Sequence, residues 1–176
     1  MLVHIPINQV SLEGTLEVPE KAKGIVVFAH GSGSSRHSVR NNFVAKILRQ
    51  AGLDSLLIDL LNDHEYLSYE KRFDIDLLSE RIIIACNWLS ENEKTKHLQL
   101  GFFGASTGAA AALTAAKALG ENVKAVVSRG GRPDLAMSIL GKVKSPTLLL
   151  VGEIDYAVID INKKAFDKLN CEKELD

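Results

Sequence analysis

Short, continuous apolar runs divide the chain, and they lie at 25–29, 55–61, 98–103, 125–128 and 147–151. Runs of this length are typical of strands that are covered on both faces, as in a parallel sheet. Between them, apolar residues recur with a helical period over 40–50, 73–89 and 107–119. The alternation of strand and helix predicts an α/β fold with a doubly wound, mostly parallel sheet.

Two further segments complete this pattern. Before the first run, β-like pieces at 2–7 and 15–18, joined by a turn around Glu13 and Gly14, predict a hairpin. The polar stretch 62–71 interrupts the alternation, and we expect it to form a small cap over a site. In a doubly wound sheet, ligands bind beyond the carboxyl ends of the strands. The functional residues should therefore lie in the loops that begin at the strand ends.

Composition narrows the class of protein. The 176 residues fit a single domain over 1–176, and 46% hydrophobic content supplies its core. The 21 basic and 22 acidic residues are interspersed and leave a net charge of −1, which predicts neither nucleic acid nor a membrane as partner. The start of the chain lacks the basic flank and apolar core of a signal peptide. We therefore expect a cytoplasmic protein with a small-molecule substrate.

The two cysteines, Cys86 and Cys171, are far apart and form no C-x-x-C motif. This spacing predicts neither a metal site nor a disulfide framework. We expect no metal and no cofactor.

The segment around Ser106 has the pattern of a nucleophile elbow. Gly104 and Gly108 flank the serine at G-x-S-x-G spacing, after a predicted strand and before a predicted helix. The sharp turn of an elbow leaves no room for side chains beside the serine, which is why glycine is needed there. The alternative is an ordinary glycine-bounded turn in which the serine caps the helix.

An oxyanion hole is predicted from the glycine-rich loop at 29–38, AHGSGSSRHS. One backbone donor would be the amide of Thr107, directly after the nucleophile, and the other that of Ser32 in this loop. A phosphate-binding loop is the alternative, but Arg36 stands where a G-x-G-x-x-G motif needs a glycine. His30, at the start of the loop, is expected to be a buried brace that hydrogen-bonds to nearby backbone.

Acidic and basic residues at other strand ends complete the candidate site. Asp155 follows the last apolar run, where a triad carboxylate is expected; the alternatives are a helix-capping role for it, or Asp134 as the acid. Arg36, Arg129 and Arg132 are candidates for binding an anionic substrate, because guanidinium groups suit carboxylates. The other interpretation is that Arg129 and Arg132 hold the GGRPD turn, for example by pairing with Asp134.

The motifs HGSGSS, GASTGAA, SRGGRPDLA and LLLVGEID resemble the α/β-hydrolase superfamily, and within it the dienelactone hydrolase-like branch. The chain is most similar to serine-bearing hydrolase domains that some bacteria join to a phosphoribosyltransferase domain. The resemblance implies Ser106 as nucleophile, Asp155 as triad acid, and Ser32 with Thr107 at the oxyanion hole. Dienelactone hydrolases proper carry a cysteine nucleophile, so the serine argues against dienelactone as the substrate.

The resemblance also implies a catalytic histidine after the triad acid, but all 5 histidines precede Asp155. We therefore expect a chain that lacks the last strand and helix, with CEKELD as the start of that strand. The sheet edge left at 147–151 would be open to a second copy. His37 is the candidate substitute base. The predicted function is a serine hydrolase of a small ester acting through an acyl-Ser106 intermediate. The alternatives are a non-catalytic binding domain of the same fold and a nucleotide-binding module.

Overall fold

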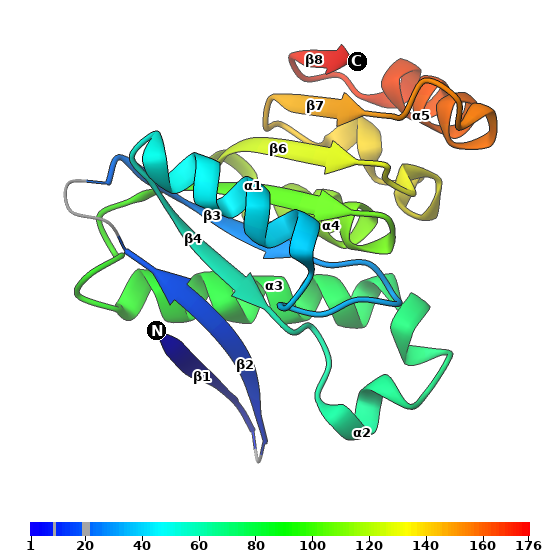
Figure 1. Ribbon diagram of the computed structural model, residues 1–176. Coiled ribbons are helices and arrows are strands. Elements are labelled where there is room, and N and C mark those ends of the chain that lie inside the picture. Colours follow the sequence, from blue (N-terminus) through cyan, green and yellow to red (C-terminus); the bar gives the residue numbers. More distant parts are fainter. Residues whose placement is uncertain (9, 19–21) are drawn as a thin grey trace.

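A computed structural model describes residues 1–8, 10–18 and 22–176 of the chain. Its centre is an eight-stranded sheet with the order β1-β2-β4-β3-β5-β6-β7-β8 (Figure 1). The strands are β1 (Leu2–Ile7), β2 (Val10–Glu17), β3 (Gly24–Ala29), β4 (Leu53–Ile58), β5 (Gln99–Ala105), β6 (Val123–Arg129), β7 (Thr147–Leu150) and β8 (Lys173–Leu175). Strands β3 to β8 pair in parallel, and β2 pairs antiparallel with both of its neighbours, β1 and β4. The predicted fold class is confirmed.

Helices cover both faces of this sheet (Figure 1). They are α1 (Val39–Gln50), α2 (Asp63–Tyr66), α3 (Ile75–Glu91), α4 (Thr107–Leu119) and α5 (Tyr156–Lys168), with short 3-10 helices η1 (Lys71–Phe73), η2 (Gly120–Asn122), η3 (Pro133–Ala136) and η4 (Leu140–Lys142). Helix α1 packs on one face over a small core around Phe28 and Phe103, whose rings are 5.1 Å apart. Helices α3, α4 and α5 contribute to the larger core on the other face.

The hairpin exists, but its turn lies elsewhere than predicted. Glu13 and Gly14 are inside β2, and the chain turns beside Asn8, whose φ is 51°. Asparagine tolerates this left-handed conformation better than most residues. This position in the strand favours glycine because a Cβ there would be 3.0 Å from Leu56 Cδ1 and 3.2 Å from Val3 Cγ2. The glycine therefore serves close packing and not a turn.

The sheet continues one strand beyond 147–151. The C-terminal segment that we expected to begin another strand forms β8, which pairs with β7 through Thr147 and Lys173. Helix α5, which connects the two strands, packs Ala165 into the larger core. None of the helices in the described part of the chain is long and apolar enough to cross a membrane.

The arrangement positions the site. All parallel strands end at the same edge of the sheet, on the right in Figure 1. The loop after β3, the cap segment after β4, and the turns after β5, β6 and β7 all leave the sheet there. Helix α4 packs closely against its surroundings because its residues are small, and Ala109 to Ala112 are all fully buried.

Candidate active site

Ser106 occupies the tight turn between β5 and α4. Its φ of 52° and ψ of −124° place it in the left-handed region, where a residue with a side chain is strained. Its neighbours permit this turn: a Cβ on Gly104 would be 2.5 Å from Ala109 Cα, and one on Gly108 would be 2.2 Å from Ala29 O. Ser106 is at the N-cap position of α4, but its hydroxyl makes no capping hydrogen bond. The turn therefore presents the hydroxyl instead of using it to cap the helix.

The two residues expected to supply the oxyanion donors lie near each other. Ser32 and Thr107 both line a cavity of about 10 Å³, which also borders Tyr66 of α2 and Leu78 of α3. Among the described residues, neither the Ser32 nor the Thr107 amide N–H has a hydrogen-bond acceptor. Both amides are therefore left without a hydrogen-bond partner in this part of the chain, although Ser106 itself does not line the cavity.

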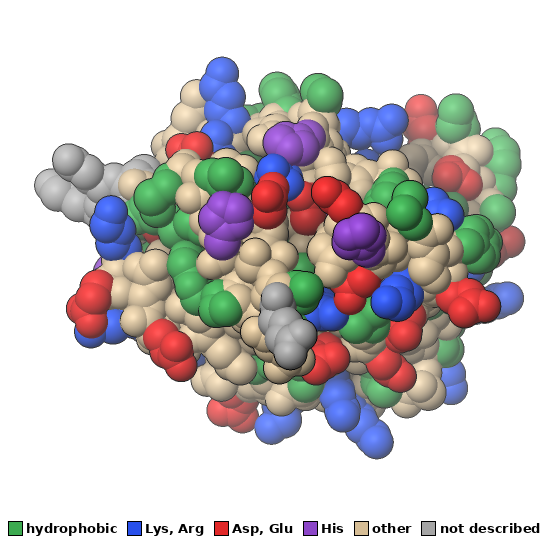
Figure 2. Space-filling model, turned by 90° about the horizontal axis from the view of Figure 1, so that it is seen from below, with side chains coloured by type: hydrophobic (Ala, Val, Ile, Leu, Met, Phe, Trp, Pro, Cys, Tyr) green, Lys and Arg blue, Asp and Glu red, His purple; other side chains and the backbone are tan. Residues whose placement is uncertain are grey.

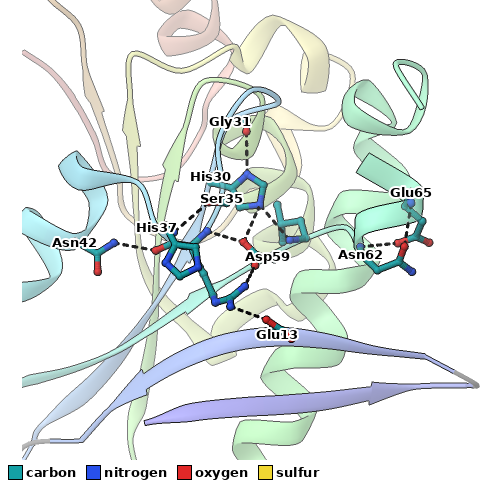
Figure 3. Close-up of polar contacts among 11 residues, drawn as sticks. Glu13, His30, Gly31, Ser35, His37, Asn42, Asp59, Asn62 and Glu65 are labelled. Atoms are coloured by element: carbon teal, nitrogen blue, oxygen red, sulfur yellow. Dashed lines mark hydrogen bonds and ion pairs between the residues drawn. The ribbon is translucent and has the colours of Figure 1, made fainter. Parts of the chain in front are cut away.

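His30 is the buried brace that the sequence predicts (Figure 3). Its Nδ1 lies 2.8 Å from the Gly31 carbonyl oxygen, and the Leu60 amide N–H donates to its Nε2 over 3.2 Å. Burial lowers the pKa of His30, although the bond to Gly31 and the charge of Asp59 oppose that shift. A neutral imidazole with Nδ1–H as donor satisfies both contacts. His30 thus links the loop after β3 to the segment after β4.

The guanidinium of Arg36 is paired with two carboxylates that the sequence did not predict, those of Asp59 and Glu13, and both partners are labelled in Figure 3. Its guanidinium binds Asp59 through Nη1 and Glu13 through Nη2, the second contact at 2.5 Å. Its backbone N–H also donates to Asp59 Oδ1 over 2.6 Å. The candidate role of Arg36 as a substrate ligand therefore loses its free guanidinium. Asp59 directly follows β4, and that position at a strand end was the available signal.

Arg129 and Arg132, the two candidate substrate ligands at the end of β6 and in the turn after it, contact different partners. Arg132 forms two hydrogen bonds to Asp134, at 2.9 and 2.8 Å, and this contact lowers the pKa of the carboxyl group. The expected pairing in the GGRPD turn is confirmed for Arg132. Arg129 donates over 3.3 Å to Asn41 of α1, and burial lowers its pKa. It lines a hollow of about 510 Å³ between the ends of β6, β7 and β8.

Asp155 lies in the loop after β7, at the same edge as Ser106. It is exposed, and its carboxylate caps α5 by accepting a 3.4 Å hydrogen bond from the Val158 amide. The capping alternative is therefore observed, and the capped helix begins at Tyr156.

The remaining histidines lie at the surface. His37 is exposed, and its backbone N–H donates to Ser35 Oγ over 3.2 Å. His4, His64 and His97 are also exposed. On the face in Figure 2 the histidine side chains lie apart from one another, among intermixed acidic and basic groups. No histidine among the described residues hydrogen-bonds to the Ser106 hydroxyl.

The cap segment after β4 closes the site from one side. Asn62 and Glu65 form a capping box on α2, and Glu65 also binds Arg81 of α3 at 2.8 Å. Tyr66 lines the small cavity beside Ser32 and also a neighbouring hollow of about 290 Å³. No group of three or more acidic, cysteine or histidine residues in the described ranges is arranged to hold a metal ion.

Comparison with known proteins places the chain in a family, although no family model matches it. A dienelactone hydrolase from Anabaena variabilis is 53% identical, with a TM-score of 0.95 over 99% of this chain and 83% of that one. The esterase Pf2001 of Pyrococcus furiosus, 16% identical, superposes with a TM-score of 0.81 over 99% of this chain and 81% of its own. The fold is that of an α/β-hydrolase. The chain belongs to the dienelactone hydrolase family.

Curated relatives are longer. Two proteins from strains of Mycobacterium tuberculosis, named as phosphoribosyl transferases, are 53% identical over 163 residues. The match includes 93% of this chain, which spans only 37% of the length of those relatives. This agrees with the resemblance to hydrolase domains that are joined to a phosphoribosyltransferase domain. That name describes proteins of which the present chain corresponds to a part.

Proposed function

We propose that this hydrolase cleaves a small carboxylic ester through a covalent acyl-Ser106 intermediate. The observation that carries the proposal is the backbone of Ser106, held at φ 52° with a hydroxyl that caps nothing. Backbone strain of this kind persists where the surrounding structure imposes it, and such residues cluster at active sites. Gly31 adds to the constraint, because a Cβ there would be 3.0 Å from Ser106 Cβ.

The reaction follows from the groups around this serine. Ser106 Oγ attacks the ester carbonyl carbon, and the carbonyl oxygen becomes an oxyanion that accepts hydrogen bonds from the Thr107 and Ser32 amides. Collapse of this intermediate breaks the bond to the leaving oxygen, which takes up the proton that the Ser106 hydroxyl has lost and departs as the alcohol. Water then attacks the acyl-Ser106 ester, which releases the acid and restores the serine hydroxyl.

The site lacks a histidine that is hydrogen-bonded to the Ser106 hydroxyl among the described residues, so the base that takes up the serine proton has to be proposed. Asp155 is the proposed triad acid, and it is a better candidate than Asp134 because Arg132 already pairs with Asp134. His37 is the proposed base, although it would have to move to reach Ser106. A serine without a positioned base is a weak nucleophile, and loss of one triad member leaves about 10³- to 10⁴-fold acceleration over water. We therefore propose slow turnover for this chain.

The substrate is proposed to be a small molecule with an anionic group. Arg36 and Arg132 are already paired with carboxylates, but Arg129 binds only the neutral side chain of Asn41. Arg129 also borders the 510 Å³ hollow at the catalytic edge. A guanidinium in this position suits a carboxylate or phosphate group of the substrate. Dienelactone is named for the Anabaena protein, and we do not extend it to this chain.

A second candidate function is a non-catalytic binding domain of the same fold. The specific observation in its favour is that no histidine of the described residues hydrogen-bonds to Ser106. Such a domain would still bind a ligand in the pocket but would not hydrolyse it.

A fluorophosphonate probe separates the two candidates. We expect covalent labelling at Ser106, located by mass spectrometry of peptides, because the hydroxyl at this strained turn makes no capping hydrogen bond. Ser106→Ala should abolish the labelling, and Ser35→Ala, which alters another serine of the same edge, should not. Labelling at a different serine, or equal labelling of Ser106→Ala, would overturn the nucleophile assignment and leave the binding domain as the better explanation.

A further inference from the structure

The loop after β3 is anchored at both ends to the same short segment. At one end, Leu60 donates to His30 Nε2 over 3.2 Å, and at the other, the Arg36 amide donates to Asp59 Oδ1 over 2.6 Å. Between the anchors, the Ser34 amide donates to the Gly31 carbonyl over 3.0 Å, so 31–34 form a tight turn. Ser32 lies at the second position of this turn, which fixes the direction of its amide.

The anchor at Arg36 is unusually complete. Asp59 receives two donors from this one residue, its backbone N–H and its guanidinium, so both the backbone and the side chain of Arg36 are fixed. Glu13 of β2 holds the other guanidinium nitrogen, and the Asp59 amide donates to the Glu13 carbonyl over 2.9 Å. The side chains of Arg36 and Asp59 are only 15% and 17% exposed, so solvent screens their attraction weakly.

We propose that the ion pair of Arg36 and Asp59 is a positioning device for catalysis, which holds the Ser32 amide where the oxyanion develops. The inference rests on the proposed function of Ser106. Arg36 acts through the loop and touches no substrate. Loss of the pair would free the end of the turn that follows Ser32, because the other anchor, at His30, holds only the end that precedes it.

The proposal predicts a specific kinetic signature. Removal of one oxyanion-hole donor typically costs about 10²- to 10³-fold in kcat, and a displaced donor should cost roughly 10-fold or more. The KM should change little, because the donor acts on charge that exists only in the transition state. A sulfur atom is a weaker hydrogen-bond acceptor than oxygen. A matched thionoester should therefore depend less on the donor than the ester does.

The experiment compares a chromogenic short-chain ester with its thionoester in the full chain. The test variants are Asp59→Ala, which removes the acceptor, and Arg36→Lys, which keeps the charge and the backbone N–H but loses the planar guanidinium. Asp59→Asn, the mildest change, decides the matter if the other two do not fold. The matched control is Arg81→Lys, which alters another buried arginine–carboxylate pair, that with Glu65 on the cap.

We expect the rate ratio of ester to thionoester to fall about 10-fold in the test variants and to stay at the wild-type value in Arg81→Lys. An unchanged ratio in folded test variants, with activity that still requires Ser106, would overturn the positioning role alone. Activity that survives Ser106→Ala would overturn the proposed function and this inference with it. Thermal midpoints of all variants separate a loss of folding from a loss of positioning.

Discussion

His30, directly after β3, and Asp54, inside β4, are both buried ionisable residues, and burial shifts their pKa values in opposite directions. The pKa of His30 is lowered from 6.5 in the folded chain. Just below pH 6.5 the imidazole is therefore protonated in the unfolded chain and stays neutral in the folded chain. Burial raises the pKa of Asp54 from 3.8 to about 6, against the smaller influence of His97. Between pH 3.8 and about 6, the Asp54 carboxyl group is therefore protonated in the folded chain and ionised in the unfolded chain.

The signs of the two effects give a testable prediction. Below pH 6.5, His30 lowers the free energy of unfolding as the pH falls, whereas Asp54 lowers it as the pH rises from 3.8 to 6. Relative to wild type, His30→Gln should therefore gain stability on acidification from pH 8 to pH 5. Asp54→Asn should gain stability from pH 4 to pH 8. Urea denaturation across this range measures both, and parallel curves for either variant would contradict its assigned shift.

Local sequence is enough to predict some residue roles and not others. The turn at Ser106 and the contact of His30 with Gly31 follow from neighbours within a few positions, whereas the second partner of His30, Leu60, lies 30 residues away. Arg36 could not be read in this way, because its partner Asp59 lies 23 residues further along the chain. Its other partner, Glu13, lies inside β2, at a position where the sequence pattern predicts a turn. Roles that depend on contacts between loops need the fold.

At the scale of elements, strong apolar patterns predicted the bounds of the central strands and helices, and the weakly patterned C-terminal elements were predicted only in outline. Strands β3 to β7 and helices α1, α3 and α4 match the predicted runs closely. For helix α5 the sequence predicted only that Asp155 could cap a helix, and not its bounds, because only Asn162 and Ala165 are fully buried and the apolar pattern is sparse. Strand β8 has three residues, and none of them is fully buried. Contact with β7 and α5, and not its own pattern, holds this strand in place.

The crossing of α4 over β3 gives the prediction at this scale. A Cβ on Gly108 would lie 2.2 Å from Ala29 O and 2.4 Å from His30 O, both backbone atoms that cannot move aside. Gly108→Ala should therefore separate α4 from β3 and cost at least about 1–3 kcal/mol in the free energy of unfolding. The labelling of Ser106 should slow as well. Gly152→Ala, where no atom lies within 4 Å, is the control. Equal stability of the two variants would contradict the close crossing.

The whole molecule has two different sheet edges. At one edge β1 carries Pro6, which cannot donate a hydrogen bond to another strand. At the other edge, β8 is paired on one side with β7. The Val151 amide donates to the Asp176 carbonyl and the Asp176 amide to the Leu149 carbonyl. Because backbone groups alternate in direction along a strand, those of Leu175 face away from β7.

This geometry supports the proposal that copies of the chain associate through β8. The strand is short and carries Lys173 and Glu174, features that weaken pairing between edges, so association should be weak. We expect sedimentation velocity to show a larger species that grows with protein concentration. Leu175→Pro should abolish it by removing the outward N–H, whereas Leu175→Ala, which loses the same side-chain packing but keeps the N–H, should not. A wild-type chain that stays monomeric, or equal association of the two variants, would exclude β8 as the contact.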